Sequence, residues 1–411
     1  MKKARIIFCL LVITTASILS QHNEFPKLTD PYPAQKPLGN LTEIFAQDVV
    51  STIKNEENSV LSKDGAEYYS SCFDPVTKYQ IFNWKNFNQD SLNPQTNLEE
   101  IKSIVYFLAD DNKLGRKYGS DESFIVSNWI KEYFESRGLE SFNNNYFQNY
   151  SYINEIGDTI RERNVIGFLK SPDFNDQNYL IVSAHFDHLG TISGEVDSIY
   201  NGANDNATGV ALILSLIQEL KQIEKRSYNV IFAAFSGEEN GLEGSGYFAK
   251  NLPVPRDKIQ LTLNFDMLGR TGNSPPYMYS ITGYNYTNLK DVIMDFNKNE
   301  NWKLEQDTTS YNNFLFMLSD NYSFVKTSGN DTIKIPAHTF KTDAAESPNY
   351  HTPQDEAHLI DYENLSNFSG YIYRLIDFIG NNKIEIKWVK EIVYEFDFES
   401  EDGKFKIIKK K

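Results

Sequence analysis

Histidine and carboxylate side chains follow three apolar segments of this sequence. The segment YLIVSA leads into His185 and Asp187, NVIFAAFS leads into Glu238 and Glu239, and QLTLNF leads into Asp266. Imidazole and carboxylate groups bind metal ions and transfer protons. The ends of these three segments are therefore candidates for chemistry.

Two loops add residues of the same types. Asp205 lies in the sequence NGANDNATG, and His351 lies in NYHTP. A single His or Asp after a strand is usually a turn or capping residue, and a pair of glutamates is often solvated surface. The joint pattern of two histidines and several carboxylates after successive apolar segments instead indicates a metal site.

The types of ligand indicate which metal and which reaction to expect. Imidazole with carboxylate is a set that suits Zn²⁺. Two ions about 3.5–4 Å apart polarise a carbonyl and generate hydroxide, but they need a group that bridges them. A carboxylate not bound to metal must then carry the proton. The adjacent Glu238 and Glu239 can divide these tasks, one at the metal and one in the cleft.

The elements that position these residues alternate between strand and helix. Buried-strand patterns occur at 179–184, 229–235, 260–265 and 335–340, and helical spacing occurs at 98–108, 126–134, 207–224, 289–299 and 362–379. Such alternation predicts an α/β fold in three layers, with a mixed, mainly parallel central β-sheet and helices on both faces. Ligands of these folds bind beyond the carboxyl ends of the strands, so the candidate residues should meet at one sheet edge.

Composition excludes some classes of protein. The chain has 411 residues, of which 40% are hydrophobic, and 56 acidic residues against 40 basic ones give a formal charge of −16. This hydrophobic content excludes a wholly disordered or fibrous protein. The acidity argues against a general nucleic-acid binder, which needs clustered Lys and Arg.

The N-terminus has the pattern of an export signal. Lys2, Lys3 and Arg5 precede an apolar run at 6–13, and small residues follow near position 20. This pattern is typical of a secretory signal peptide, and the apolar run is short for a membrane anchor. We therefore expect residues 1–20 to be removed and the protein to be extracytoplasmic, periplasmic or secreted, with no stable membrane insertion. Cys72 then remains the only cysteine, which excludes an intrachain disulfide.

Several motifs together resemble peptidase family M28, which contains co-catalytic zinc aminopeptidases and related carboxypeptidases. They are SAHFDHLG at 183–190, NGANDNATG at 201–209, FSGEENGLEGS at 235–245, NFDMLGR at 264–270 and YHTPQDE at 350–356. A weaker match is LADDNKLGRKYGS at 108–120. The resemblance implies a zinc exopeptidase-like domain at 96–382. It leaves 21–95 as an N-terminal extension and 383–411 as a tail, both of unknown role.

The resemblance implies a role for each matching residue. The metal ligands would be His185, Asp205, Glu239, Asp266 and His351, with Asp205 bridging two Zn²⁺ ions and the two histidines on different ions. Glu238 would be the general base, and Asp187 would hold the imidazole of His185. The peptide bond after Asp205 would be cis.

Other positions depart from the family pattern. Ser319, Asp320 and Asn321 replace the usual Ser-Asp-His, and an apparent insertion follows at 328–332. That region borders the substrate pocket, so the resemblance does not predict side-chain preference. His188 is not a family ligand and is interpreted as loop packing or as support for a ligand. His338 is expected in the core.

The resemblance implies an exported aminopeptidase that acts on peptides with a free N-terminus. A carboxypeptidase or dipeptidase is an alternative, in which Arg270 would hold the substrate carboxylate. A relative that cyclises N-terminal glutamine uses a reduced, single-metal ligand set, and the presence of His185 argues against it. A catalytically silent binding domain is a further alternative, although such domains usually lose a ligand or the base.

Overall fold

The computed structural model describes residues 94–154, 156–173, 178–194, 197–270, 278–306, 308, 310–325, 327–328, 331–332, 334–342, 348–390, 396–401 and 404–409. The expected signal peptide, Cys72 and nearly all of the expected N-terminal extension lie outside these residues. The chain divides into two units, one of which is Trp84–Glu395. This unit carries every candidate site residue.

The central sheet has eight strands in the order β1-β2-β6-β3-β7-β12-β8-β9. Strands β6, β3, β7 and β12 run parallel at its centre, whereas β1, β2 and β8 pair antiparallel with a neighbour. The expected mixed, mainly parallel sheet is therefore confirmed. The strands are β1 (Phe147–Ile153), β2 (Thr159–Leu169), β3 (Tyr179–His185), β6 (Asn229–Phe235), β7 (Ile259–Phe265), β8 (Met278–Ile281), β9 (Lys303–Leu304) and β12 (Ala337–Lys341).

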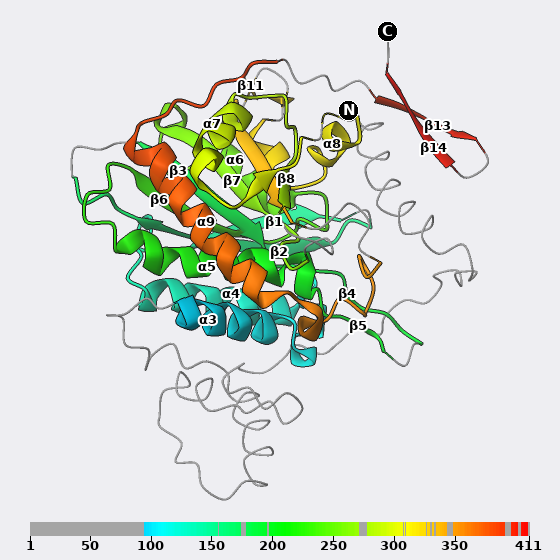
Figure 1. Cartoon of the computed structure of the whole chain (residues 1–411). Helices are drawn as coiled ribbons and strands as arrows, with labels where there is room; N and C mark the ends of the chain where they lie inside the picture. Colours follow the sequence, from blue (N-terminus) through cyan, green and yellow to red (C-terminus); the bar gives the residue numbers. More distant parts are fainter. Residues whose placement is uncertain are drawn as a thin grey trace, which may run out of the picture. The chain divides into compact units, whose positions relative to one another are not determined.

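Helices cover both faces of this sheet (Figure 1). On one face lie α3 (Pro94–Leu108), α4 (Asp121–Ser136), α5 (Thr208–Lys221) and α9 (Tyr362–Asn381). On the other, α6 (Glu243–Lys250) packs against β1 and β2. Every residue of β6 is buried, because helices on both faces exclude water from a central parallel strand.

The face beneath α6 has its own hydrophobic core. Ile181 of β3 and Phe235 of β6 pack there with Phe248 of α6 and Phe324. The rings of Phe235 and Phe248 have centroids 5.4 Å apart. This packing holds β3 and β6 in place close to the strand ends that lead to His185 and Glu238.

The β1–β2 hairpin was not among the expected elements. It adds two antiparallel strands beyond β6, and Asn149, Ser151 and Ile153 of β1 are exposed at the sheet edge. The strand expected at 335–340 begins at Ala337 instead, directly after Pro336, since proline has no N–H to donate to a sheet ladder. The helix expected at 289–299 is α7 (Leu289–Phe296), continued by a 3₁₀ turn at Asn297–Asn299.

Short elements complete this unit. They are β4 (Gly190–Thr191), β5 (Ile199–Tyr200), α8 (Ser310–Leu315), β10 (Thr327–Ser328), β11 (Asp331–Thr332) and the 3₁₀ segments Asp111–Arg116, Arg256–Lys258, Asp320–Phe324 and Ala357–Leu359. In the other unit, β13 (Phe396–Glu401) and β14 (Lys404–Lys409) form an antiparallel hairpin within the predicted tail.

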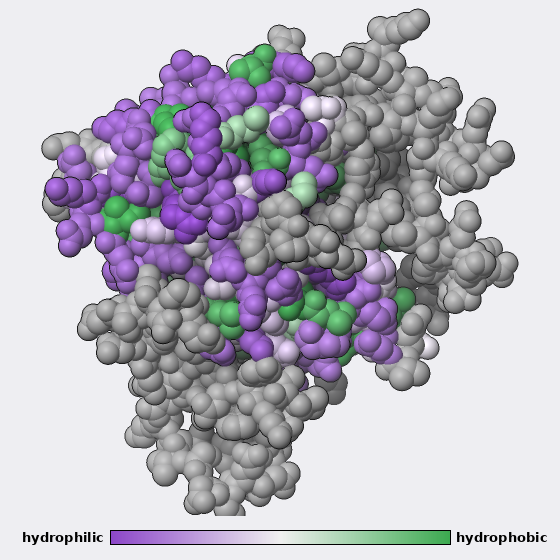
Figure 2. Space-filling model, in the orientation of Figure 1, coloured by the Kyte–Doolittle hydropathy of each residue, from purple (hydrophilic) through white to green (hydrophobic). Residues whose placement is uncertain are grey.

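Among the described residues on the face seen in Figure 2, hydrophilic side chains dominate, and the hydrophobic patches among them are small and separated. Among the described helices, none combines the length and the apolar character that crossing a bilayer requires.

Candidate metal centre

The site lies at the carboxyl ends of three neighbouring strands. In the sheet the order is β6-β3-β7, although β3 comes first in the chain. The connection that leaves β3 runs to β6 on one side, whereas the connection that leaves β6 crosses to β7 on the other side, and such a reversal opens a crevice beyond the strand ends. His185 is the last residue of β3, Glu238 and Glu239 follow β6 closely, and Asp266 follows β7 directly.

Asp205 enters the crevice from a tight turn before α5. The turn is a π-helical segment at Ala203–Ala207, and the peptide bond from Asp205 to Asn206 is cis, as the resemblance implied. Gly202 precedes it with a φ of 56°, and a Cβ there would lie 2.3 Å from the carbonyl oxygen of Asp205. Only glycine permits this close approach.

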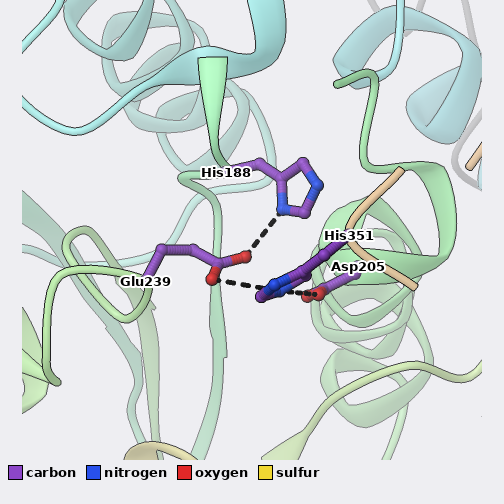
Figure 3. Close-up of side chains that lie close together, drawn as sticks. All are labelled: His188, Asp205, Glu239 and His351. Atoms are coloured by element: carbon purple, nitrogen blue, oxygen red, sulfur yellow. Dashed lines mark hydrogen bonds and ion pairs between the residues drawn. The ribbon is translucent and has the colours of Figure 1, made fainter. Parts of the chain in front are cut away.

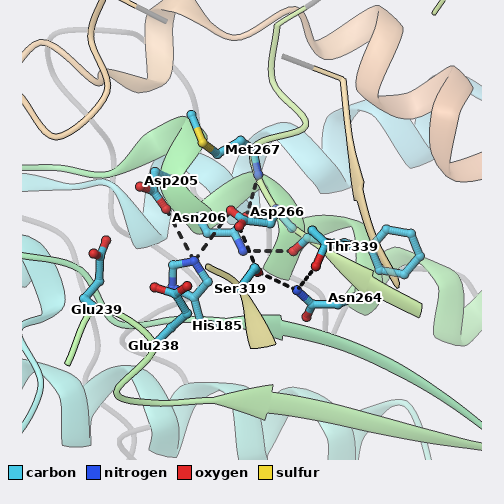
Figure 4. Close-up of polar contacts among 12 residues, drawn as sticks. His185, Asp205, Asn206, Glu238, Glu239, Asn264, Asp266, Met267, Ser319 and Thr339 are labelled. Atoms are coloured by element: carbon cyan, nitrogen blue, oxygen red, sulfur yellow. Dashed lines mark hydrogen bonds and ion pairs between the residues drawn. The ribbon is translucent and has the colours of Figure 1, made fainter. Parts of the chain in front are cut away.

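Asp205, His185 and Asp266 form the first group (Figure 4). His185 Nε2 lies 3.3 Å from Asp205 Oδ1 and 3.7 Å from Asp266 Oδ1. Ser319 donates a hydrogen bond to the other oxygen of Asp266, Oδ2, at 3.0 Å. The carboxylate of Asp266 is thus oriented with one oxygen toward His185.

Asp205 also belongs to a second group with His188, Glu239 and His351 (Figure 3). His351 Nε2 lies 3.2 Å from Asp205 Oδ2 and 3.2 Å from Glu239 Oε2. The two oxygens of Asp205 therefore face different histidines. The two groups therefore share the carboxylate of Asp205, with one oxygen in each.

The spacing of these atoms fits zinc. Tetrahedral sites with bonds of about 2.0–2.1 Å place neighbouring ligand atoms roughly 3.3 Å apart. The separations around Asp205 and His351, 3.2 to 3.3 Å, match that value. The contact from His185 to Asp266, at 3.7 Å, is somewhat wider. The side chains of both groups are also nearly buried, apart from His351 at 17% exposure.

The charges of both groups depend on one another. Burial opposes ionisation of Asp205, yet hydrogen bonds from His185 and His351 hold its pKa well below the ordinary range. Glu239 is also buried, and the charge of His351 with hydrogen bonds from the histidines lowers its pKa to about 2. Carboxylates that stay ionised while buried need cations beside them.

Glu238 lies beside the ligands rather than among them (Figure 4). Burial raises its pKa well above the ordinary range, against the attraction of His185 and with added repulsion from Glu239 and Asp320. Its backbone N–H donates to Asp187 Oδ1 at 3.2 Å. A carboxylate with a raised pKa, held next to a metal position, is suited to accept and release a proton.

Asp187 faces Nδ1 of His185 through two groups. Its backbone carbonyl lies 3.2 Å from Nδ1, and its carboxylate Oδ1 lies 3.7 Å away. The same carboxylate oxygen also accepts the N–H of Glu238. Asp187 thus joins the His185 loop to the loop of Glu238.

The model of peptidase family M28 matches residues 164–376. The chain belongs to peptidase family M28. Aminopeptidase YwaD of Bacillus subtilis (strain 168) is 26% identical over 215 residues, which is 49% of this chain and 41% of that relative. The chain spans less than half the length of the curated relatives it matches first.

Solved structures share the M28 fold of this chain. The glutaminyl cyclase of Porphyromonas gingivalis superposes with a TM-score of 0.54 at 16% identity, covering 68% of this chain and 97% of that one. The zinc aminopeptidase BSAP of Bacillus subtilis gives a TM-score of 0.53 at 14% identity, covering 68% and 94%. At these identities the likeness establishes the fold alone.

Two residues in the M28 motifs support the site in ways that the sequence did not indicate. Arg116 is 1% exposed and donates to the backbone carbonyls of Leu108, Phe186, Asn201 and Gly202 at 2.6 to 3.0 Å. It therefore ties the two loops that carry His185 and Asp205 to the end of α3. Asp355 accepts backbone N–H groups of the Asp205 loop. Both lie in matched motifs, but nothing in their types identified these partners.

Lys341, at the end of β12, was also not predicted. Its Nζ lies 3.8 Å from Asp266 Oδ2. Burial raises the pKa of Asp266, but the net shift is downward, and the charge of Lys341 is the largest of the effects that lower this pKa.

The remaining histidines and Arg270 lie outside the two candidate ligand groups. His338 is completely buried in β12, which confirms the expectation of a core residue, and His358 is exposed on a 3₁₀ turn. His22 lies outside the described residues. Arg270 Nη2 lies 3.7 Å from Asp355 Oδ1, and its side chain is 20% exposed.

Proposed function

We propose that this M28 chain is an exported, zinc-dependent aminopeptidase that hydrolyses the N-terminal bond of peptides with two Zn²⁺ ions. The observation that carries the proposal is the position of Asp205. One of its oxygens lies 3.3 Å from His185 and the other lies 3.2 Å from His351. Two ligand groups that share one carboxylate are the arrangement that a pair of ions requires.

The ligands of one ion would be His185, Asp205 and Asp266, and those of the other would be Asp205, Glu239 and His351. When bound, zinc ions of such a pair polarise the scissile carbonyl and make water a stronger nucleophile at neutral pH. The chain itself holds the ligands at tetrahedral separations and excludes water around them. Support for zinc also comes from the likeness to BSAP, whose description names that metal.

Glu238 would move the proton. Its carboxylate would take a proton from the attacking water and pass it to the amine that leaves. Burial raises its pKa well above the ordinary range, which favours the protonated form of Glu238 more than at a surface glutamate. Asp187 would keep Glu238 in place through the backbone N–H that it accepts.

Aminopeptidase activity is favoured over the alternatives by a relative and by the surroundings of Arg270. The relative YwaD is named an aminopeptidase. A carboxypeptidase would use Arg270 for the substrate carboxylate, but Asp355 already lies 3.7 Å from this guanidinium.

Export is proposed from the N-terminal sequence alone. The basic residues followed by the apolar run at 6–13 are what the secretion machinery recognises. N-terminal sequencing of the protein recovered from the native cell's medium or periplasm would identify the start of the mature chain. Recovery only with the cytosol, with residues 1–20 intact, would contradict export.

The decisive experiment measures zinc content and substrate choice together. Purified protein should contain about two zinc ions per chain and should hydrolyse aminoacyl-anilides and free peptides. N-acetylated peptides test the free amine, C-terminally amidated peptides test the carboxylate, and glutaminyl peptides test cyclisation. Turnover of acetylated peptides that is lost on C-terminal amidation would reveal a carboxypeptidase. Release of pyroglutamate would reveal a cyclase, and no turnover of any substrate would reveal a silent domain.

A further inference from the structure

His188 makes the shortest contact to a proposed metal ligand in this site. Its Nδ1 lies 2.7 Å from Glu239 Oε1 (Figure 3). As a proposed metal ligand Glu239 is a carboxylate, and carboxylate oxygens only accept hydrogen bonds. The proton of this bond must therefore be on Nδ1 of His188.

The two oxygens of Glu239 have different neighbours. Oε1 accepts from His188, whereas Oε2 lies 3.2 Å from His351 Nε2, which in turn lies 3.2 Å from Asp205 Oδ2. Oε2 is thus the oxygen that would bind the metal ion. The contact from His188 fixes the rotation of the carboxylate that decides which oxygen takes that place.

The ring of His188 is itself held rigidly. It is 1% exposed, and it packs edge-on against His351 with centroids 5.6 Å apart. Its backbone N–H donates to the carbonyl of Arg116 at 3.3 Å. A Cβ on Gly202 would lie 2.6 Å from the ring, so glycine at 202 also makes room for it. A donor with so little freedom can orient the group that it contacts.

We propose that His188 is a positioning residue that holds Glu239 Oε1 away from the metal position, so that Oε2 binds one zinc ion through a single oxygen. The inference rests on the proposed zinc function. His188 also belongs to the group that could hold an ion, so the alternative is that it is a ligand itself. Nδ1 cannot donate to Glu239 and bind a metal at the same time, and the 2.7 Å contact favours donation.

Loss of the N–H that His188 donates should weaken the binding of one zinc ion and leave the binding of the other unchanged. Groups that orient a metal ligand typically contribute 10- to 100-fold to metal affinity. Glu239 belongs to the group of His351, whereas the group of His185 and Asp266 does not contain it. His188→Phe keeps a ring of similar width but has no N–H, so we expect one zinc site to weaken by roughly 10- to 100-fold.

A matched variant separates positioning from ligation. In His188→Asn, the side-chain NH₂ takes the place of Nδ1–H and can donate to Glu239, but an amide nitrogen does not bind zinc. We therefore expect His188→Asn to retain both zinc affinities within a few-fold. His358→Asn, on the exposed 3₁₀ turn, is the control for removal of a histidine as such.

The experiment measures both zinc affinities by competition with a chromophoric chelator, and the melting temperature of each metal-free variant. The proposal is supported if His188→Phe weakens one zinc site, His188→Asn restores its affinity, and the metal-free melting temperatures stay similar. An equal loss of zinc affinity in both variants would show that His188 is a ligand. Unchanged zinc affinities, or weaker binding at both sites together with a lower melting temperature, would show that His188 only packs. Each of these results overturns the proposal. Wild-type protein that binds no zinc would instead overturn the proposed function.

Discussion

The carboxylate of Asp355 accepts a hydrogen bond from the backbone N–H of Asp205 at 2.9 Å. Its other oxygen accepts from Asn204 at 3.1 Å, and its backbone carbonyl accepts from Ala203 at 3.0 Å. Asp355 lies in the same loop as His351, whose φ of 54° is unusual for a residue other than glycine. One buried carboxylate therefore docks the loop of His351 onto the turn of Asp205.

Asp355→Asn should weaken zinc binding. The new NH₂ group would face one of the backbone N–H groups that now point at an oxygen, which leaves a buried donor unpaired at a cost of about 1–3 kcal/mol. We expect roughly tenfold weaker zinc binding and a lower kcat, because Asp205 and His351 lose their common support. Zinc titration by calorimetry and steady-state kinetics measure the two effects. Asp257→Asn, an exposed acid of a 3₁₀ turn, is the control, and equal behaviour of both variants would contradict this role.

Glu238→Gln should abolish turnover while zinc stays bound. The amide cannot accept the proton of the attacking water, so kcat should fall by about three to five powers of ten. Elemental analysis should still find about two zinc ions per chain, since Glu238 is not in either ligand group. Glu363→Gln, an exposed residue of α9, makes the same chemical change far from these groups and should keep full activity. Retained activity of Glu238→Gln, or lost zinc, would reject the assignment of the base.

Removal of the metal should stop hydrolysis and lower stability. The buried carboxylates of the site then lose the cations that offset their charge, so the melting temperature should fall on treatment with a strong chelator. Zn²⁺ added back should restore both hydrolysis and melting temperature, whereas Mg²⁺ should not, because it prefers sites made of oxygen alone. Undiminished hydrolysis by protein shown to be free of metal would end the metallopeptidase proposal.

His338 should make the free energy of unfolding depend on pH. Its Nδ1 donates to the carbonyl of Thr282 at 2.8 Å, and its Nε2 lies 2.7 Å from the hydroxyl of Thr287, which can donate to a neutral ring. Burial lowers its pKa to about 4 from the ordinary 6.5. Between these two values the unfolded chain binds a proton that the folded chain does not, so stability falls as the pH falls through this window.

The size of this effect can be measured by difference. The lowered pKa of His338 corresponds to roughly 3 kcal/mol of unfolding free energy, which is lost as the pH falls from about 6.5 to about 4. Urea unfolding of metal-free protein should show a shallower pH dependence in His338→Gln than in wild type. His358→Gln, at an exposed position, should retain the wild-type slope. Identical slopes in wild type and His338→Gln would show that His338 titrates normally.

Much of the fold and of the site follows from local sequence. The apolar run at 229–235 predicts a strand buried on both faces, and β6 has these bounds. The helical spacing before residue 108 and after residue 362 predicts α3 and α9. Periodicity of apolar residues is a local property, so the sequence is sufficient for such elements. The β1–β2 hairpin was not predicted, because β1 and the first half of β2 carry polar residues that also suit loops.

The residue types alone determined that the chain carries imidazole and carboxylate groups at the ends of apolar segments, with Glu238 and Glu239 adjacent. Only the tertiary structure decided that Asp205 presents one oxygen to His185 and the other to His351. It also decided that Asp355, 150 residues away in the chain, supports Asp205, and that His188 takes one oxygen of Glu239. Such contacts depend on the order of strands in the sheet and on the packing of loops over its edge, which arise from interactions distant in sequence and leave no local pattern to read.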